Sequence, residues 1–170
     1  MILAFVRIST CLILSLLLFV ACNQSRHIIS DRNLKDDKAY AEARNKKIEK
    51  IKSLAGKLIG RPYRSGSSGP VSFDCSGFTS HVFNTINITL PRKASDQAHL
   101  GHVIKLDSVE PGDLLFFGSK RVDHVALVSK VHRGKITIIH SASSIGVSQL
   151  ELQKSDYWMK RLKFGRRIII

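Results

Sequence analysis

A cysteine in the middle of the chain is the side chain best suited to nucleophilic chemistry. It lies in the segment Phe73–Phe78, which reads FDCSGF. Of the three cysteines, Cys11 lies within an N-terminal apolar run and Cys22 lies where that run ends, so Cys75 alone belongs to the globular part. A single thiol of this kind is a candidate catalytic nucleophile. The alternative is a small buried hydrophobic residue, which is the commoner role of a free cysteine.

The residues that follow Cys75 predict a helix that starts close to it. Apolar side chains recur at helical spacing from Phe78 to Ile86. The unpaired N–H groups and the positive dipole end of a helix start favour a thiolate, and the same N–H groups can hold an oxyanion. Asp74 suits an N-cap, a structural role that the sequence does not separate from a catalytic one.

A cysteine nucleophile needs a base, which is usually histidine. Of the seven histidines, His124 and His140 stand in apolar, strand-like segments. If a three-residue loop over 132–134 joins these segments, His140 opposes Ala126 and His124 is its diagonal neighbour, about 7–8 Å away at the backbone. A two- or four-residue loop would put the histidines on opposite faces. The hypothesis is nucleophile Cys75, base His124 and orienter His140, and it predicts an odd loop length.

The hydrophobic pattern also predicts the elements that must position these groups. A helix is expected from Asp37 to Ile59, because Ile and Leu recur every three or four residues and Gly60 with Pro62 ends the run. Strands are expected in the second half, separated by turn residues. Helices followed by adjacent strands favour an α+β fold with a mainly antiparallel sheet. The expected strands cover residues 113–117, 124–131, 135–140 and 147–152.

The N-terminus has the features of an export signal. Arg7 is the only charge in the first 25 residues, and the apolar run that follows is short for a membrane span but has the size of a signal-peptide core. The residues before Cys22 resemble a bacterial lipobox, in which the cysteine is acylated and becomes the mature N-terminus, although Phe19 replaces the usual Leu. An ordinary cleaved signal is the alternative. The predicted division is a lipoprotein signal peptide over 1–21, a lipid-anchored tether over 22–37 and a globular domain over 38–170.

The chain is strongly basic, with 27 Lys and Arg against 13 Asp and Glu and a formal charge of +14. The export signal, and the lack of a basic run that alternates with aromatics, argue against nucleic acid. Anionic cell-wall polymer or phospholipid headgroups are the expected counter-surfaces, with a merely solvated basic surface as the alternative. His99 and His102 alone have metal-ligand spacing and lack a third ligand, so no metal or other cofactor is expected.

A series of short motifs resembles the NlpC/P60 family of papain-like cysteine peptidases, and the resemblance runs from about Ile51 to Arg167. Ala126 replaces the more usual Gly, and Ser65 and Ser67 replace an aromatic residue and a second Gly. These departures leave the three candidate catalytic positions unchanged. The motif residues are Gly60–Tyr63, Phe73–Phe78, Leu90–Arg92 with Ser95 and Gln97, Pro111–Phe117, Asp123–Val128, Ile139–Ala142 and Tyr157–Trp158.

The resemblance implies a papain-like α+β fold, with N-terminal helices packed on a mainly antiparallel sheet. It also implies hydrolysis of peptidoglycan stem peptides, typically between γ-D-glutamate and a diamino acid. By the same match Tyr63 would contribute its hydroxyl near the oxyanion, beside the Cys75 amide. A loop aromatic that covers the edge of the core is the alternative for Tyr63.

The sequence therefore predicts a monomeric cysteine endopeptidase that acts on peptidoglycan and is anchored to the membrane by lipid on Cys22. The cell envelope is the expected location, with the outer membrane favoured because Asn23 is not the usual inner-membrane retention residue Asp. Two alternatives stay open. One is a lipoprotein that binds stem peptides without cutting them, and the other is amidase or acyl-transfer chemistry on the same fold.

Overall fold

The computed structural model describes residues 34–170, which divide into two units, residues 34–43 and residues 44–170. Residues 34–57 are helical, close to the helix predicted over 37–59. The expected signal peptide, Cys22 and residues 22–33 of the expected tether lie outside the described residues. Between residues 34 and 170, no helix is both long and apolar enough to cross a membrane.

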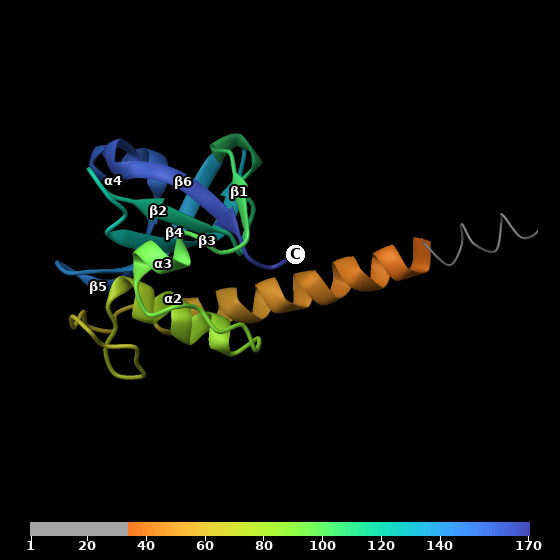
Figure 1. Cartoon of the computed structure of the whole chain (residues 1–170), viewed down its shortest axis with the longest axis horizontal. Coiled ribbons are helices and arrows are strands. Elements are labelled where there is room, and N and C mark those ends of the chain that lie inside the picture. The colour runs from red at the N-terminus through yellow and green to blue at the C-terminus, as the bar shows by residue number, and fades with distance from the viewer. Residues whose placement is uncertain (1–33) are drawn as a thin grey trace, which may run out of the picture. The chain divides into compact units, whose positions relative to one another are not determined.

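One antiparallel sheet of six strands forms the centre of the second unit (Figure 1). The strand order is β1-β6-β2-β3-β4-β5. Helices precede the strands and short helices lie between them, so the predicted α+β class is confirmed. The elements are α2 (Cys75–Asn84), α3 (Ala94–Gln97), β1 (His102–Ile104), η1 (Leu106–Ser108), β2 (Leu114–Phe117), β3 (His124–His132), β4 (Lys135–Ala142), β5 (Gly146–Glu151), η2 (Leu152–Lys154), α4 (Asp156–Arg161) and β6 (Leu162–Arg167).

The four predicted strands correspond to β2, β3, β4 and β5, whereas β1 and β6 were not predicted. The sequence of β6 is LKFGRR, so charged residues obscure the alternation of a half-buried strand. Its place comes from pairing, because β6 lies between β1 and β2 and bonds to both. Tertiary pairing thus overrides local propensity here.

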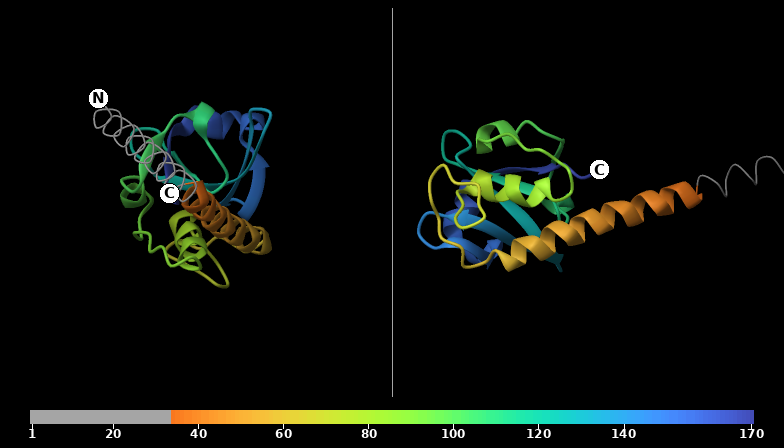
Figure 2. Two further views of the ribbon diagram at one scale, coloured as in Figure 1. Left: turned by 90° about the vertical axis from the view of Figure 1, so that its right-hand side faces the viewer. Right: turned by 90° about the horizontal axis from the view of Figure 1, so that it is seen from below.

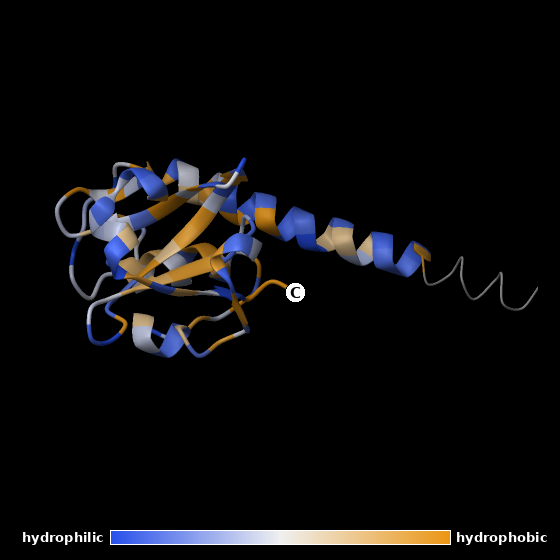
Figure 3. Cartoon of the chain, turned by 90° about the horizontal axis from the view of Figure 1, so that it is seen from above, coloured by the Kyte–Doolittle hydropathy of each residue, from blue (hydrophilic) through white to orange (hydrophobic). Residues whose placement is uncertain are grey.

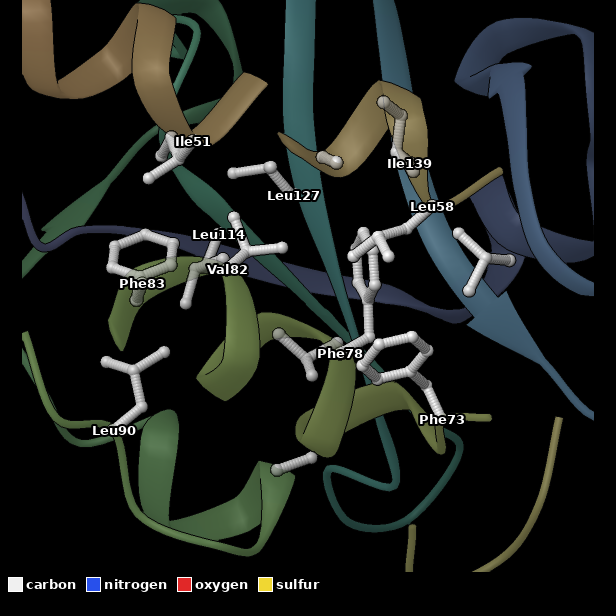
Figure 4. Close-up of a cluster of buried hydrophobic side chains, with 14 of the residues drawn as sticks. Ile51, Leu58, Phe73, Phe78, Val82, Phe83, Leu90, Leu114, Leu127 and Ile139 are labelled. Carbon is white, nitrogen blue, oxygen red and sulfur yellow. The ribbon is translucent and has the colours of Figure 1, made fainter. Parts of the chain in front are cut away.

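Apolar side chains form one core cluster on each face of the sheet. Successive strand residues point to opposite faces, and all four residues of β2 are buried, so this strand contributes to both clusters. The first cluster joins the sheet to α2 and to residues 44–57 of the N-terminal helix, which lie on the same side of it (Figures 2 and 4). The second lies under α4. The first includes Ile51, Val82, Phe83, Leu114 and Leu127, and the second includes Leu115, Phe117, Val128 and Leu152, with Trp158 packed against it.

Colouring by hydropathy shows the same division (Figure 3). The strands carry long apolar stretches, whereas the N-terminal helix is mostly hydrophilic with isolated apolar positions. Ile48, Ile51 and Ala55 are its buried positions at helical spacing, and the buried Leu58 directly follows the helix. The helix therefore contributes one apolar stripe to the first cluster.

The loop of the β3–β4 hairpin differs from the predicted one. His132 pairs with Lys135, so the loop consists of two residues, Arg133 and Gly134. Both have positive φ angles, 49° and 75°, as a type I′ turn requires. The predicted three-residue loop is therefore wrong.

A β-bulge in β3 nevertheless restores the predicted pairing beyond the loop. The register shifts between Val128 and Lys130, which leaves Ser129 as an extra residue on β3. Beyond the bulge Leu127 pairs with Ile139. Continued along the strands, this register sets Ala126 against His140. The histidines thus share a face for a different reason from the one that the sequence suggested.

Candidate active site

Cys75 is the first residue of α2, and Asp74 caps this helix. Asp74 Oδ1 accepts a hydrogen bond from the Gly77 N–H at 2.7 Å, and Oδ2 accepts one from the Gly66 N–H at 2.9 Å. The Arg92 guanidinium bonds to both carboxylate oxygens. Burial alone would raise the pKa of Asp74, but Arg92 and the two N–H groups outweigh it and hold that pKa below its ordinary value. The structure therefore supports the structural reading of Asp74.

Close packing around Gly77 fixes the start of α2. A Cβ atom on Gly77 would lie 2.2 Å from the carbonyl oxygen of Ser67, so no larger residue fits without a shift of the loop. On the other side of the helix, the buried Gln97 amide donates to the Ser76 carbonyl at 3.1 Å and to the Pro91 carbonyl at 2.8 Å. The contact at Gly77 and the bond to the Ser76 carbonyl therefore restrain the backbone that directly follows Cys75.

A hydrogen bond also ties this segment to the strand that bears His140. The buried Ser141 hydroxyl donates to the Phe73 carbonyl at 2.8 Å. Phe73 lies two residues before Cys75, and Ser141 follows His140 directly. The two halves of the site are therefore connected by one short, buried contact.

His124 and His140 are hydrogen-bonded to each other. His124 Nε2 lies 2.9 Å from His140 Nδ1, and the two rings are nearly perpendicular at 86°. Both side chains are buried, with exposed fractions of 8% and 0%. The structure thus brings the two predicted histidines together, as a base with an orienting partner requires.

The thiol of Cys75 lies close to the start of β3, the strand that carries His124. Its Sγ lies 3.9 Å from the carbonyl oxygen of Asp123, the residue directly before His124. The thiol is half-buried, and it lines the same hollow as His124. A thiol, a histidine and a second histidine are therefore gathered at one end of the sheet.

The electrostatics of the site favour neutral groups. Burial, followed by the Asp74 charge, raises the pKa of Cys75, although the N–H groups of Val125, Ser76 and Cys75 itself act in the opposite direction. The predicted thiolate is therefore wrong for the resting site, because burial outweighs the helix start.

Both histidines are held neutral as well. Burial, with smaller contributions from His140 and Arg161, lowers the pKa of His124 to about 3. Burial lowers the pKa of His140 to about 4. At neutral pH the site therefore holds a thiol and two uncharged imidazoles, so His124 is in the form that can accept a proton.

Two hollows meet at Cys75. One of about 660 Å³ is lined by Arg92, Lys93 and Arg121, among others, and one of about 410 Å³ is lined by residues that include His124. Cys75, Tyr63 and Asp123 line both. The thiol therefore lies at the junction of the two hollows, where an extended peptide bound in both would pass over it.

Tyr63 lies beside the thiol, as the family resemblance implied. Burial, then the charges of Cys75 and Asp74, raises the pKa of the Tyr63 hydroxyl. The phenol therefore keeps its proton at neutral pH and can donate a hydrogen bond into either hollow. Its place beside Cys75 in both hollows is compatible with an oxyanion donor.

Sequence reasoning missed several residues that shape the site. Arg92, Gln97 and Trp158 belong to the motifs, but the sequence assigned them no role. The ion pair between the Arg161 guanidinium and the Asp123 carboxylate, with N–O distances of 2.6 and 2.8 Å, was not predicted. No local pattern links partners so far apart in the chain. A signal did exist for Trp158, because it is the single tryptophan of the sequence.

Among the residues that the structure describes, three further histidines of the sequence lie away from the Cys75–His124–His140 site. His99 follows α3, His102 starts β1, and His132 ends β3 in an exposed position. Within the described part of the chain, no group of three or more His, Cys, Asp or Glu side chains is placed to hold a metal ion. The chemistry that the site offers is that of a thiol nucleophile with a histidine base.

A thiol at a helix start, beside two bonded histidines on an antiparallel sheet, defines a papain-like domain. The chain belongs to the NlpC/P60 family, whose sequence profile matches residues 60–167. The predicted family and fold are thereby confirmed.

Individual relatives agree with this assignment. The gamma-DL-glutamyl hydrolase of Bacillus subtilis is 35% identical over 122 residues, which are 71% of this chain and 30% of that protein. This chain thus spans less than a third of that relative's length. A Staphylococcus aureus structure, named as similar to a lipoprotein of the NLP/P60 family, has a TM-score of 0.63 and 34% identity over 74% of this chain and 42% of that one. The NlpC/p60 domain of the peptidoglycan hydrolase SagA has a TM-score of 0.61 and 28% identity over 71% of this chain and 97% of that one.

Proposed function

We propose that this protein is a peptidoglycan endopeptidase that hydrolyses a stem-peptide amide bond between γ-D-glutamate and a diamino acid. The observation that carries the proposal is the 2.9 Å contact between His124 and His140, next to the hollow that His124 shares with Cys75. The names of the relatives support the substrate, since one is a gamma-DL-glutamyl hydrolase and another a peptidoglycan hydrolase.

The proposed reaction begins with acylation of Cys75. Sγ attacks the amide carbonyl carbon while His124 takes the thiol proton on Nδ1, the ring nitrogen that does not face His140. The carbonyl oxygen gains the negative charge and is held by the Cys75 amide N–H and the Tyr63 hydroxyl. The C–N bond then breaks, His124 returns the proton to the leaving amine, and a thioester remains.

Hydrolysis of the thioester completes the cycle. His124 takes a proton from a water molecule, whose oxygen attacks the thioester carbon. When the C–S bond breaks, the sulfur regains the proton from His124 and a carboxylic acid is released. Throughout the cycle His140 holds the His124 ring in one orientation through their hydrogen bond.

The charge of the groove agrees with this substrate. Arg92, Lys93 and Arg121 line the larger hollow, and within residues 34–170 neither Lys93 nor Arg121 forms an ion pair. Stem peptides carry free carboxylates, which basic side chains at a groove attract. The proposal therefore assigns part of the basic excess of the chain to substrate binding.

Attachment to the membrane by lipid on Cys22 is part of the proposal and rests on the sequence around that residue. Two or more acyl chains on one cysteine are enough for stable anchoring. We place the protein in the cell envelope, with the outer membrane favoured, as a monomer. Mass spectrometry of the N-terminal peptide tests the modification, and Cys22→Ala should move the protein from the membrane to the soluble fraction.

A digest of purified peptidoglycan tests the function directly. Wild-type protein should release muropeptide fragments that end in D-glutamate, detected by mass spectrometry, and Cys75→Ser should release none above background. His124→Ala should lose activity to the same degree. The matched control is His132→Ala, because His132 is an exposed histidine on the same strand and should leave the digest unchanged.

The products also separate this proposal from its rivals. Fragments cut at the glycan–peptide link would indicate an amidase, and transfer of the acyl group to another acceptor would indicate an acyltransferase. Binding of stem peptides without products would indicate a binding lipoprotein. If Cys75→Ser digests as well as the wild type does, the mechanism is wrong.

A further inference from the structure

Trp158 on α4 contacts both histidines of the site. Its indole ring is stacked on the His124 ring, with centroids 4.4 Å apart and planes 28° apart. It meets the His140 ring at 4.9 Å and nearly at right angles, 81°. The two imidazole centroids are themselves 5.1 Å apart. Each of the three rings therefore packs against the other two, with the indole beside both hydrogen-bonded imidazoles.

The nitrogens of the pair leave one polar atom without a partner. His124 Nε2 and His140 Nδ1 share a single hydrogen. His140 Nε2 is buried and has no hydrogen-bond partner among residues 34–170. If His140 Nδ1 is the acceptor, Nε2 carries a hydrogen, and the indole packed edge to face with this ring is an aromatic group that can accept such a hydrogen weakly. If Nδ1 is the donor, Nε2 is a bare lone pair, to which an aromatic face offers nothing.

This difference favours the arrangement that catalysis needs. When His140 Nδ1 accepts, His124 donates through Nε2 and its Nδ1 is free to take the Cys75 proton. When His140 Nδ1 donates, the His124 hydrogen lies on Nδ1 and the base is blocked. A hydrogen on His140 Nε2 is therefore compatible with a working site, and a bare lone pair at this atom is not.

Contacts on both sides hold α4 in this position. The Ser155 side chain accepts from the Trp158 N–H at the start of the helix. Arg161 near its end pairs with Asp123, and the Gly118 N–H donates to the Arg161 carbonyl at 2.8 Å. The helix is thereby tied to the chain directly before His124, so the indole and the imidazole below it are held by one local network.

We propose that Trp158 is a positioning residue that covers the His124–His140 hydrogen bond, excludes water from it and selects the tautomers in which His124 can act as base. This inference rests on the proposed cysteine-peptidase function. It deepens that function, since it adds a residue that acts through the histidines and not on the substrate.

Packing of the Trp158 indole against the two histidines has a measurable consequence for the protonation of His124. The charged or titratable groups around the pair are Cys75 on α2, Tyr63, Asp123 before β3, and Tyr157 and Arg161 on α4. None of these is removed by a change of Trp158. Loss of the indole lets water reach the pair, so the pKa of His124 should rise from about 3 toward the ordinary value for histidine.

The test compares wild type, Trp158→Ala and Trp158→Phe in the full chain. Nitrogen-15 NMR of the histidine rings follows the protonation and tautomer of His124 between pH 4 and 8, with no need for activity. Wild type should show an uncharged His124 with its hydrogen on Nε2 throughout. Trp158→Ala should titrate with a midpoint near pH 6 or above, within the measured range, and Trp158→Phe, which keeps an aromatic ring over the pair, should titrate between Trp158→Ala and wild type.

Kinetics provide the second measurement. For Trp158→Ala, kcat/KM at pH 5 should be about tenfold or more below its value at pH 7, whereas wild type should change by less than about twofold. The control is Phe83→Leu, because Phe83 is a fully buried aromatic of the other core cluster and contacts neither histidine. It lowers stability without uncovering the pair and should keep the wild-type titration.

Two results of the NMR titration would overturn the inference. If His124 titrates in Trp158→Ala and Trp158→Phe as in wild type, or if the wild-type hydrogen lies on Nδ1, Trp158 has no positioning role. Should wild type fail to digest peptidoglycan, the proposed function falls, and the NMR titration still decides whether the indole covers the pair.

Discussion

At the scale of single residues, burial decides the protonation state of the site. A helix start normally favours a thiolate, yet Cys75 keeps its proton because it is half-buried next to the Asp74 carboxylate. His124 and His140 stay uncharged because both are buried, and the charges of His140 and Arg161 lower the pKa of His124 further. The site therefore rests uncharged at its nucleophile and base, and in the proposed reaction charge arises only during the attack of the sulfur.

This state predicts an unusual pH profile. The base works only when His124 is uncharged, and its pKa of about 3 keeps it so well below neutrality. We expect kcat/KM on peptidoglycan fragments to be nearly the same at pH 5 and pH 7. A histidine with an ordinary pKa would lose about 30-fold over this range. A fall of that size, measured with short assays in which the protein stays folded, would contradict the assigned protonation.

At the scale of elements, α2 and the β3–β4 hairpin have separate tasks. Helix α2 presents the thiol, and its first turn is held by Asp74, Arg92 and the tight contact at Gly77. The hairpin presents both histidines, and the bulge at Ser129 corrects a register that its two-residue loop alone would have set wrongly. Small local errors in either element would separate the nucleophile from its base.

The packing at Gly77 leads to a direct test. In Gly77→Ala the new methyl group would lie 2.2 Å from the Ser67 carbonyl oxygen, so the loop or the helix start must move. We expect a loss of about 1–3 kcal/mol in the free energy of unfolding and at least a tenfold loss of activity, since Cys75 moves with the helix. Urea denaturation and the peptidoglycan digest measure the two effects.

The chain contains a matched control for this substitution. Gly56 lies in the N-terminal helix, and a Cβ atom there would meet nothing within 4 Å. Gly56→Ala should raise stability by about 0.5–1 kcal/mol, because alanine is the better helix former, and should leave activity unchanged. A stable, active Gly77→Ala protein would show that the contact is not a constraint.

At the scale of the whole molecule, the buried histidines link stability to pH. Their folded-state pKa values of about 3 and 4 lie below the ordinary value of 6.5, so the unfolded chain binds protons that the folded chain does not. Stability is therefore lost as the pH falls below about 6.5. Each histidine should account for about 2 kcal/mol between pH 7 and pH 5.

Urea denaturation at these two pH values measures this loss. His140→Gln should lose less stability between pH 7 and pH 5 than wild type does, whatever its absolute stability. His132→Ala, which removes an exposed histidine from the same strand as His124, should show the wild-type difference. Equal stability of the wild type at both pH values would show that the pair is accessible to protons.

Residue types and their order were enough to identify the nucleophile, the base and its orienter as candidates, together with the family and the α+β class. They were enough because one thiol remained after the N-terminal cysteines were assigned, and because strands and helices have distinct hydrophobic periods. Strand β6 escaped prediction because its pattern is interrupted by charge and its pairing partners lie far away in the chain.

The tertiary structure alone decided how these residues work. Whether Cys75 is a thiol or a thiolate depends on burial by groups distant in sequence, and the bulge at Ser129 depends on the pairing of whole strands. The same holds for the Arg92–Asp74 pair and for the stacking of Trp158 on His124. The sequence shows which side chains are present and how far apart they are along the chain. The distances between them, the low dielectric around the buried groups and the register of the strands exist only once the core has formed.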